Sequence, residues 1–262
     1  MLLFDIDGVV RDVSASYRRA IQETVAYFCA VRPEIETIDA LKSEGCWNND
    51  WDASLELVRR HKDQADSVLR LPKRSEVVDV FSRFYFGGDP NGKPSFWQGF
   101  IRNEALLVDK NFFQELRLCG WDWGFVSGAE PPSARFVLEQ RIGLQAPPLI
   151  AMGEVPDKPD PTGLIQLTDR LMANRSDQPI HENQTRVAYL GDTVADVMTV
   201  QAARERRPDI LWLSLGVAPP HLWNNQKSRS SYERDLVKAG ADRILSSTQE
   251  LLDVHEQLEW PN

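Results

Sequence analysis

Cysteine and histidine, which often bind metals or carry nucleophilic chemistry, are scarce in this sequence of 262 residues. The three cysteines, Cys29, Cys46 and Cys119, have the spacing of neither a zinc site nor a disulfide framework. The four histidines are scattered, without the short spacing of metal ligands. An odd number of cysteines favours a reducing compartment, so we expect a cytoplasmic protein without a zinc site.

An excess of positive charge and long apolar runs are also missing. The formal net charge of -9 disfavours binding to nucleic acid, because a phosphate backbone requires a basic partner. No apolar run approaches the length of a membrane span. The apolar start is too short for a signal peptide and runs directly into two aspartates. We therefore expect no nucleic acid and no membrane among the partners, while a local basic group remains compatible with a small anion.

The spacing of apolar residues divides the chain into regions of different structure. Between residues 14 and 86 the spacing is helical, as for Ile21, Val25 and Phe28, and a cluster of turn-forming residues follows at 87–94. From about residue 109, short apolar strands alternate with helices, which is typical of a parallel sheet. The sequence predicts an α/β fold with a doubly wound parallel sheet, formed by residues 1–13 and 95–262. An inserted α-helical cap domain is expected at residues 14–94.

Two aspartates lie at the end of the first apolar run. Asp5 and Asp7 follow Leu2–Phe4, which reads as a buried strand, and Gly8 permits a tight turn after them. Open α/β sheets bind ligands at the carboxyl ends of their strands, so both side chains are expected at a ligand site. Like charges this close require a cation or a shared proton, and Mg²⁺ is the hard cation that suits carboxylates.

Three further segments place polar residues at or near strand ends. Ser127 and Gly128 follow the second core strand and offer a hydroxyl and a backbone N–H to a phosphate. Lys158 lies in a proline-stiffened turn and supplies a positive charge. Asp192 ends another strand, and Asp196 follows at the start of a helix. Taken alone, Ser127 and Gly128 could form a plain turn, Lys158 could be a surface lysine, and Asp192 or Asp196 could cap a helix. Because all these segments occur in one order along the chain, each at a strand end, together they predict a shared site.

With these motifs the sequence resembles the haloacid dehalogenase superfamily over nearly its whole length. The resemblance rests on Asp5-Ile6-Asp7-Gly8-Val9-Val10 with Asp12, Ser127, Lys158-Pro159-Asp160-Pro161, Gly191-Asp192 with Asp196, and Ala239-Gly240-Ala241-Asp242-Arg243-Ile244. The long insert before Ser127 is similar to that of subfamily IA, which includes phosphoglycolate phosphatase and β-phosphoglucomutase. The resemblance implies a Rossmann-like core with a helical cap that chooses the substrate.

The resemblance also implies a role for each motif residue. Asp5 is expected to be the nucleophile that forms an aspartyl-phosphate, and Asp7 the general acid and base. Mg²⁺ is expected to bind to Asp5, the backbone carbonyl of Asp7, and Asp192, with support from Asp196. Ser127, Gly128 and Lys158 are expected to bind the phosphoryl group.

The acid at position 7 separates the reactions known in this superfamily. The family's dehalogenases lack an acid there, whereas phosphatases and phosphomutases need a group that can donate and accept a proton. The sequence therefore predicts a Mg²⁺-dependent phosphatase acting on a small phosphorylated metabolite. A phosphomutase of the β-phosphoglucomutase kind and a binding protein without turnover are the alternatives, and no oligomeric state is predicted.

Substrate specificity is less clearly encoded in the sequence. Trp47 and Asn48 lie in a segment, residues 44–51, that we expect to form a cap loop contacting the substrate. Packing of Trp51 and helix capping by Asn49 or Asp50 would explain the same segment. Arg11 is a candidate for binding a substrate anion, with an ordinary ion pair as the alternative.

Overall fold

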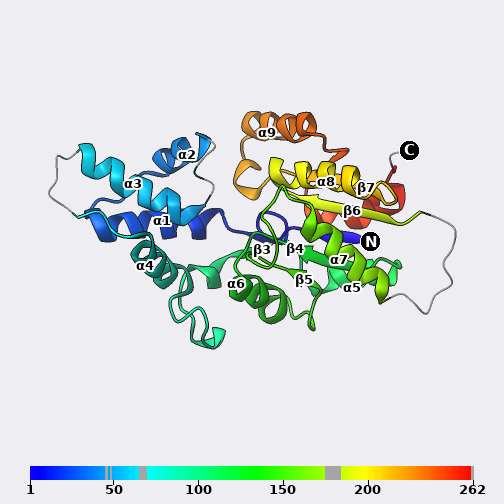
Figure 1. Ribbon diagram of the computed structural model, residues 1–262, viewed down its shortest axis with the longest axis horizontal. Helices are drawn as coiled ribbons and strands as arrows, with labels where there is room; N and C mark the ends of the chain where they lie inside the picture. Colours follow the sequence, from blue (N-terminus) through cyan, green and yellow to red (C-terminus); the bar gives the residue numbers. More distant parts are fainter. Residues whose placement is uncertain (45–46, 48, 65–69, 175–183, 261–262) are drawn as a thin grey trace. The chain divides into compact units, whose positions relative to one another are not determined.

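The structure is a computed structural model that describes all residues except 45–46, 48, 65–69, 175–183 and 261–262. Contacts between residues divide the chain into two compact units (Figure 1). We call residues 1–12 with 105–262 the core unit, and residues 13–104 the inserted unit.

The core unit contains a six-stranded, wholly parallel sheet in the order β5-β4-β1-β6-β7-β8. The strands are β1 (Leu2–Phe4), β4 (Trp123–Val126), β5 (Leu149–Ile150), β6 (Arg186–Gly191), β7 (Leu211–Val217) and β8 (Arg243–Leu245). A small antiparallel pair joins β2 (Arg11–Asp12) to β3 (Ala105–Leu106). The parallel sheet confirms the predicted α/β fold.

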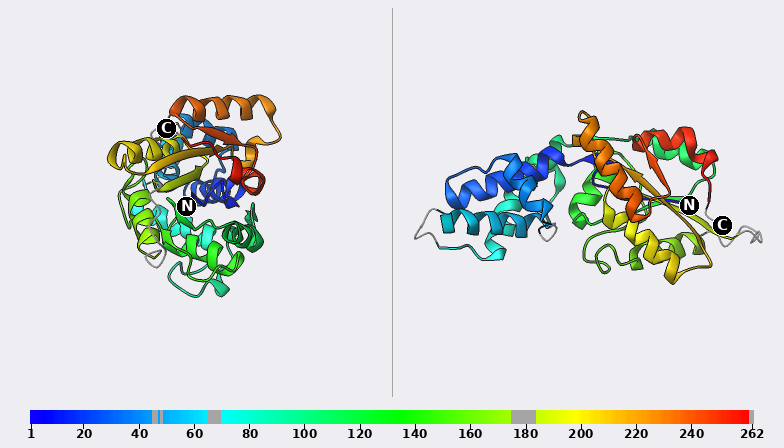
Figure 2. Two further views of the ribbon diagram at one scale, coloured as in Figure 1. Left: turned by 90° about the vertical axis from the view of Figure 1, so that its right-hand side faces the viewer. Right: turned by 90° about the horizontal axis from the view of Figure 1, so that it is seen from above.

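Helices cover both faces of the parallel sheet (Figure 2). The helices are α5 (Lys110–Leu118), α6 (Pro131–Arg135), α7 (Thr162–Ala173), α8 (Val194–Arg206), α9 (Gln226–Ala239) and α10 (Leu251–Val254). Residues Phe136–Arg141 continue α6 as a π-helical segment. The sheet with helices on both faces is the doubly wound arrangement that the β-α alternation predicts.

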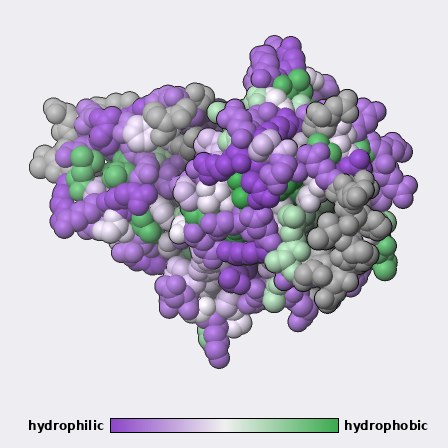
Figure 3. All heavy atoms as spheres, turned by 45° about the vertical axis from the view of Figure 1, so that its right-hand side comes forward, coloured by the Kyte–Doolittle hydropathy of each residue, from purple (hydrophilic) through white to green (hydrophobic). Residues whose placement is uncertain are grey.

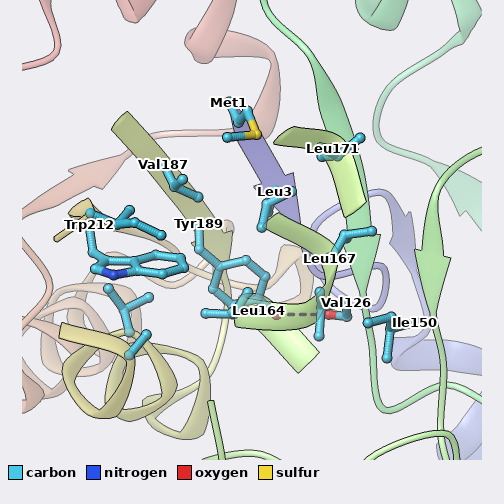
Figure 4. Close-up of a cluster of buried hydrophobic side chains, with 13 residues drawn as sticks. Met1, Leu3, Val126, Ile150, Leu164, Leu167, Leu171, Val187, Tyr189 and Trp212 are labelled. Atoms are coloured by element: carbon cyan, nitrogen blue, oxygen red, sulfur yellow. Dashed lines mark hydrogen bonds between the residues drawn. The ribbon is translucent and has the colours of Figure 1, made fainter. Parts of the chain in front are cut away.

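Neighbouring residues of β1 pack on opposite faces of the sheet, because successive side chains of a strand point in opposite directions. Leu3 packs on the face covered by α7 and α8, while the Phe4 ring meets Phe113 of α5 edge-on, with centroids 5.7 Å apart. Figure 4 shows the first of these clusters, which comprises Met1, Leu3, Val126, Ile150, Leu164, Leu167, Leu171, Val187, Tyr189, Val200, Ala203, Ile210 and Trp212. Both faces are thus buried, which fixes the position of the β1 carboxyl end.

In the described part of the inserted unit, the chain forms four helices and two short 3₁₀ segments. They are α1 (Ser14–Cys29), α2 (Ile35–Ser43), α3 (Asp50–Gln64), α4 (Arg74–Phe86), η1 (Pro94–Phe96) and η2 (Phe100–Asn103). The unit ends at Glu104, beyond the boundary expected at residue 94. The difference arises because Trp97 packs on Phe86, and Glu104 accepts hydrogen bonds from Ser16 and Tyr85.

The face that Figure 3 turns toward the reader carries mainly hydrophilic residues, with apolar residues in small, scattered groups. Among the described residues, no helix combines the length and the apolar composition required to cross a membrane.

Candidate active site

The predicted motif residues of the core unit lie around the carboxyl ends of three adjacent strands. Asp5 follows β1, Ser127 follows β4, and Asp192 follows β6. Strand β1 lies between β4 and β6, so the chain leaves the centre of the sheet in both directions at this point. Such a switch in strand order is where open α/β sheets form ligand sites.

Three aspartates meet at this point. One carboxylate oxygen from each of Asp5, Asp192 and Asp196 lies within 4.8 Å of the others, and all three residues are buried. They come from parts of the chain nearly 190 residues apart, which the parallel pairing of β1 with β6 brings together. This cluster is the expected cation site, with the carboxylate of Asp7 outside it.

Lys158 completes the cluster with a positive charge. Its Nζ lies 3.1 Å from Asp5 Oδ1 and 2.5 Å from Asp196 Oδ1. It also donates a hydrogen bond of 3.2 Å to the hydroxyl of Tyr189. That hydroxyl lies 2.9 Å from the carbonyl oxygen of Val126 (dashed line in Figure 4) and 3.0 Å from Asp196 Oδ1. The ammonium is therefore held between Asp5 and the start of α8.

Asp196 has a second role as part of a helix cap. Its Oδ2 accepts hydrogen bonds from Thr193 N (3.0 Å) and Thr193 Oγ1 (2.6 Å), while its own N–H donates to Thr193 Oγ1. This reciprocal arrangement is a capping box at the start of α8. Both oxygens of Asp196 thus have partners within the protein, so Asp5 and Asp192 are the more available ligands for a cation.

Burial dominates the acid–base behaviour of the cluster. It raises the pKa of Asp5 to about 6, against the opposing charge of Lys158. Burial, followed by the charges of Asp196 and Asp5, holds the pKa of Asp192 well above its usual value. Burial also disfavours ionised Asp196, but the ammonium and hydrogen bonds of Lys158 outweigh it and lower its pKa. One ammonium cannot offset three ionised carboxylates, so without a cation Asp5 and Asp192 keep their protons to a higher pH than an exposed aspartate does.

The residues present fit a divalent cation. Asp5 Oδ1 is buried and has no hydrogen-bond partner among the described residues, since Lys158 is close but not aligned with it. Gly8 leaves room for the Asp192 carboxylate: a Cβ at Gly8, which has φ +73°, would lie 2.0 Å from Asp192 Oδ2. A buried carboxylate oxygen without a donor, next to a second carboxylate, is the oxygen-rich environment that Mg²⁺ prefers.

Asp7 is oriented differently from Asp5. Its side chain is 25% exposed, and its Oδ1 accepts a 2.7 Å hydrogen bond from Nε of Arg11. The expected cation contact through its backbone carbonyl stays a prediction. Asp7 is therefore more exposed than Asp5.

Ser127 and Gly128 lie on the β4 side of the cluster. Ser127 is buried, and its Oγ accepts a hydrogen bond of 3.2 Å from the N–H of Ala129. A Cβ placed on Gly128 would meet nothing within 4 Å, so the backbone there borders open space. These positions leave a hydroxyl and an accessible backbone segment beside the carboxylates; their binding of a phosphoryl group stays a prediction.

The three proposed specificity residues, Arg11, Trp47 and Asn48, have different environments. Arg11 is fully buried, so its guanidinium is not presented to a substrate in this structure, contrary to its suggested role as an anion ligand. In the inserted unit, Trp47 donates a 3.0 Å hydrogen bond from Nε1 to Glu44. Asn48 lies outside the described residues. Asn49 caps α3 by accepting from the backbone of Trp51, the structural alternative that the sequence offered.

Tyr189, Tyr232 and Thr193 also contribute to the site, although the sequence did not predict them. Tyr189 contacts Lys158 and Asp196, and Tyr232 donates a 2.9 Å hydrogen bond to the carbonyl oxygen of Asp192. The sequence gives no signal for either tyrosine, because nothing local indicates what a hydroxyl will meet. Thr193 was detectable, since Thr-x-x-Asp before a helix is a variant of the capping-box pattern.

The fold and this site define a doubly wound α/β protein with a buried carboxylate cluster at the carboxyl edge of its parallel sheet. Comparison with known proteins identifies the family. The family model described as "Hydrolase: haloacid dehalogenase-like hydrolase" matches residues 1–204, and the chain belongs to this family.

Individual relatives are more distant. The chain is 28% identical over 259 residues to "Imidazoleglycerol-phosphate dehydratase" from Phytophthora nicotianae, covering 97% of this chain and 52% of that protein. The chain thus spans about half the length of this curated relative. Phosphatase Tt82 from Thermococcus thioreducens shares the fold, with a TM-score of 0.60, 20% identity, and coverage of 90% and 98% of the two chains. CbbY from Rhodobacter sphaeroides, solved in complex with phosphate, has a TM-score of 0.57 and 16% identity, and the match covers 95% of each chain.

Proposed function

We propose that the protein is a Mg²⁺-dependent phosphatase that hydrolyses a small phosphate monoester through an aspartyl-phosphate. The observation that carries this proposal is the convergence of Asp5, Asp192 and Lys158 at the carboxyl end of β1. A nucleophilic carboxylate can approach an anionic phosphate only where positive charge offsets their repulsion. Lys158 supplies one such charge, and the cluster offers ligands for a cation.

The residues divide the reaction between them. A carboxylate oxygen of Asp5 attacks phosphorus while the bond to the leaving oxygen breaks, and Asp7 gives its proton to that oxygen. Asp7 then accepts a proton from the water that hydrolyses the aspartyl-phosphate. Lys158, Ser127 and the N–H of Gly128 bind the phosphoryl oxygens. Asp5, Asp192 and the Asp7 carbonyl, with support from Asp196, would hold Mg²⁺, which would supply further positive charge.

The inserted unit is proposed to be the cap that selects the substrate, with Trp47 as a contact residue. The substrate class is a small phosphorylated metabolite. The relative named imidazoleglycerol-phosphate dehydratase makes phosphate esters that carry an imidazole ring a reasonable part of any substrate panel. A cytoplasmic location, inferred from the cysteine content, stays a prediction.

The test is phosphate release from a panel of phosphoglycolate, sugar phosphates, nucleotides, imidazoleglycerol phosphate and an aryl phosphate, with Mg²⁺ or with EDTA. The wild type should release phosphate only with Mg²⁺, and Asp5→Asn should abolish release. The exposed Asp253 provides the matched control, since Asp253→Asn changes the same functional group elsewhere in the core unit. Isomerisation of a sugar phosphate without net release would identify a phosphomutase instead. No turnover of any substrate would favour a binding protein.

A further inference from the structure

Arg11 has an unusual environment for an arginine. Its side chain is fully buried, and its Nε donates a 2.7 Å hydrogen bond to Asp7 Oδ1. Burying a guanidinium costs free energy unless the charge is paired, and the carboxylate of Asp7 provides that pairing. Arg11 is therefore a buried residue whose charge is paired with the carboxylate of Asp7.

The backbone holds both members of this ion pair in place. The N–H of Gly8 donates to the carbonyl of Arg11 (2.9 Å), and the N–H of Arg11 donates to the carbonyl of Ile6 (3.1 Å). Arg11 also belongs to β2, where it pairs with Leu106 of β3. The tight turn after β1 thus brings the side chains at positions 7 and 11 together, and the β2–β3 pair restrains the arginine from the other side.

We propose that Arg11 is a positioning residue for the proton transfer carried out by Asp7. By holding Oδ1, the guanidinium restricts rotation of the carboxyl group, so that Oδ2 is the oxygen that exchanges the proton. In the first step the proton passes from Asp7 to the leaving oxygen as the bond between that oxygen and phosphorus breaks and Asp5 bonds to phosphorus. This inference rests on the proposed phosphatase function.

Positioning of a proton donor has a distinctive kinetic consequence. An alkyl phosphate has a poor leaving group that needs the proton, whereas 4-nitrophenyl phosphate releases a stable phenolate that hardly needs it. The parameter kcat/KM covers the steps up to phosphoryl transfer to Asp5, so it compares the two leaving groups directly. A merely structural residue would change kcat/KM for both substrates by the same factor.

Two variants separate the hydrogen bond from the bulk of the side chain. Arg11→Gln retains an N–H donor at the position of Nε, because the amide nitrogen of Gln is bonded to the same side-chain carbon. Arg11→Met has similar length but no donor. We expect Arg11→Met to lower kcat/KM for the best alkyl phosphate by about 100-fold, and for 4-nitrophenyl phosphate by less than about tenfold. Arg11→Gln should fall between Arg11→Met and the wild type for the alkyl phosphate.

A double-mutant cycle with Asp7→Asn tests the same coupling. In the Asp7→Asn background the proton donor is gone, so adding Arg11→Met should cause little further loss with the alkyl phosphate. Circular dichroism and Mg²⁺ titration calorimetry check that each variant is folded and binds the cation. If Arg11→Met does not fold, Arg11→Lys, which moves the donor one bond outward, must lower the alkyl-to-aryl ratio.

The outcomes distinguish this inference from the function on which it rests. An active wild type with equal losses on both substrates, or with additive losses in the cycle, would overturn the role of Arg11 alone. A wild type that releases phosphate from neither substrate would overturn the phosphatase proposal.

Discussion

Replacing Asp5 by asparagine should stabilise the protein in the absence of divalent cations. Asp5 is buried, and its pKa is raised from 3.8 to about 6, chiefly by burial. A carboxyl group whose folded-state pKa is raised favours folding when protonated and opposes folding when ionised. The cost of ionised Asp5 is therefore complete above pH 6 and disappears as the pH falls toward 3.8.

The magnitude follows from the size of the shift. About two pKa units at 1.36 kcal/mol each give a cost of about 3 kcal/mol at pH 7.5. Asparagine has nearly the same shape but no charge, so Asp5→Asn should raise the free energy of unfolding by up to about 3 kcal/mol. At roughly 2–4 °C per kcal/mol, the unfolding temperature should rise by several degrees.

Thermal and urea unfolding with EDTA and with Mg²⁺ provide the assay. With Mg²⁺ the order should reverse, because the cation stabilises the wild type through a ligand that Asp5→Asn lacks. The control Asp253→Asn, at an exposed position, should change stability by less than about 0.5 kcal/mol. A variant Asp5→Asn that is less stable than the wild type at pH 7.5 with EDTA would contradict this prediction, and so would one that keeps the full stabilisation by Mg²⁺.

Three further predictions concern Lys158, Gly8 and Trp47. Lys158→Met should destabilise the cation-free protein by about 3–5 kcal/mol, because it leaves buried carboxylates unpaired, and an unchanged urea midpoint would contradict this. Gly8→Ala should abolish the rise in unfolding temperature that Mg²⁺ causes, because the new Cβ would collide with the Asp192 carboxylate. The control Gly120→Ala, also at positive φ but with no neighbour within 4 Å, should retain that rise. Trp47→Ala should raise KM for the best substrate several-fold with little change in kcat, whereas the same KM across the panel would exclude Trp47 from substrate binding.

Much of the core could be predicted from the sequence because its signals are local. An apolar run followed by Asp5, Asp7 and Gly8 specifies a strand and a tight turn within one stretch of chain. The β-α alternation then requires parallel strands, whose carboxyl ends share one edge of the sheet. These two facts are enough to expect Asp5 and Asp192 at the same site.

The inserted unit shows where local signals end. The turn cluster at 87–94 marks a break in secondary structure, but the unit continues to Glu104. Its boundary is decided by the hydrogen bonds that Ser16 and Tyr85 donate to Glu104, and by the packing of Trp97 on Phe86. Nothing in the composition of residues 95–104 specifies these partners.

By itself, the sequence determined the parallel α/β core, the strand-end acids and the basic residue that accompanies them, since each follows from periodicity, turn chemistry or charge within a short segment. Only the tertiary structure decided how individual side chains are used. It paired Arg11 with Asp7, divided Asp196 between a helix cap and Lys158, and placed the hydroxyl of Tyr189 beside both. The physical reason is that a side chain's partner depends on which strands become neighbours and how deeply they are buried.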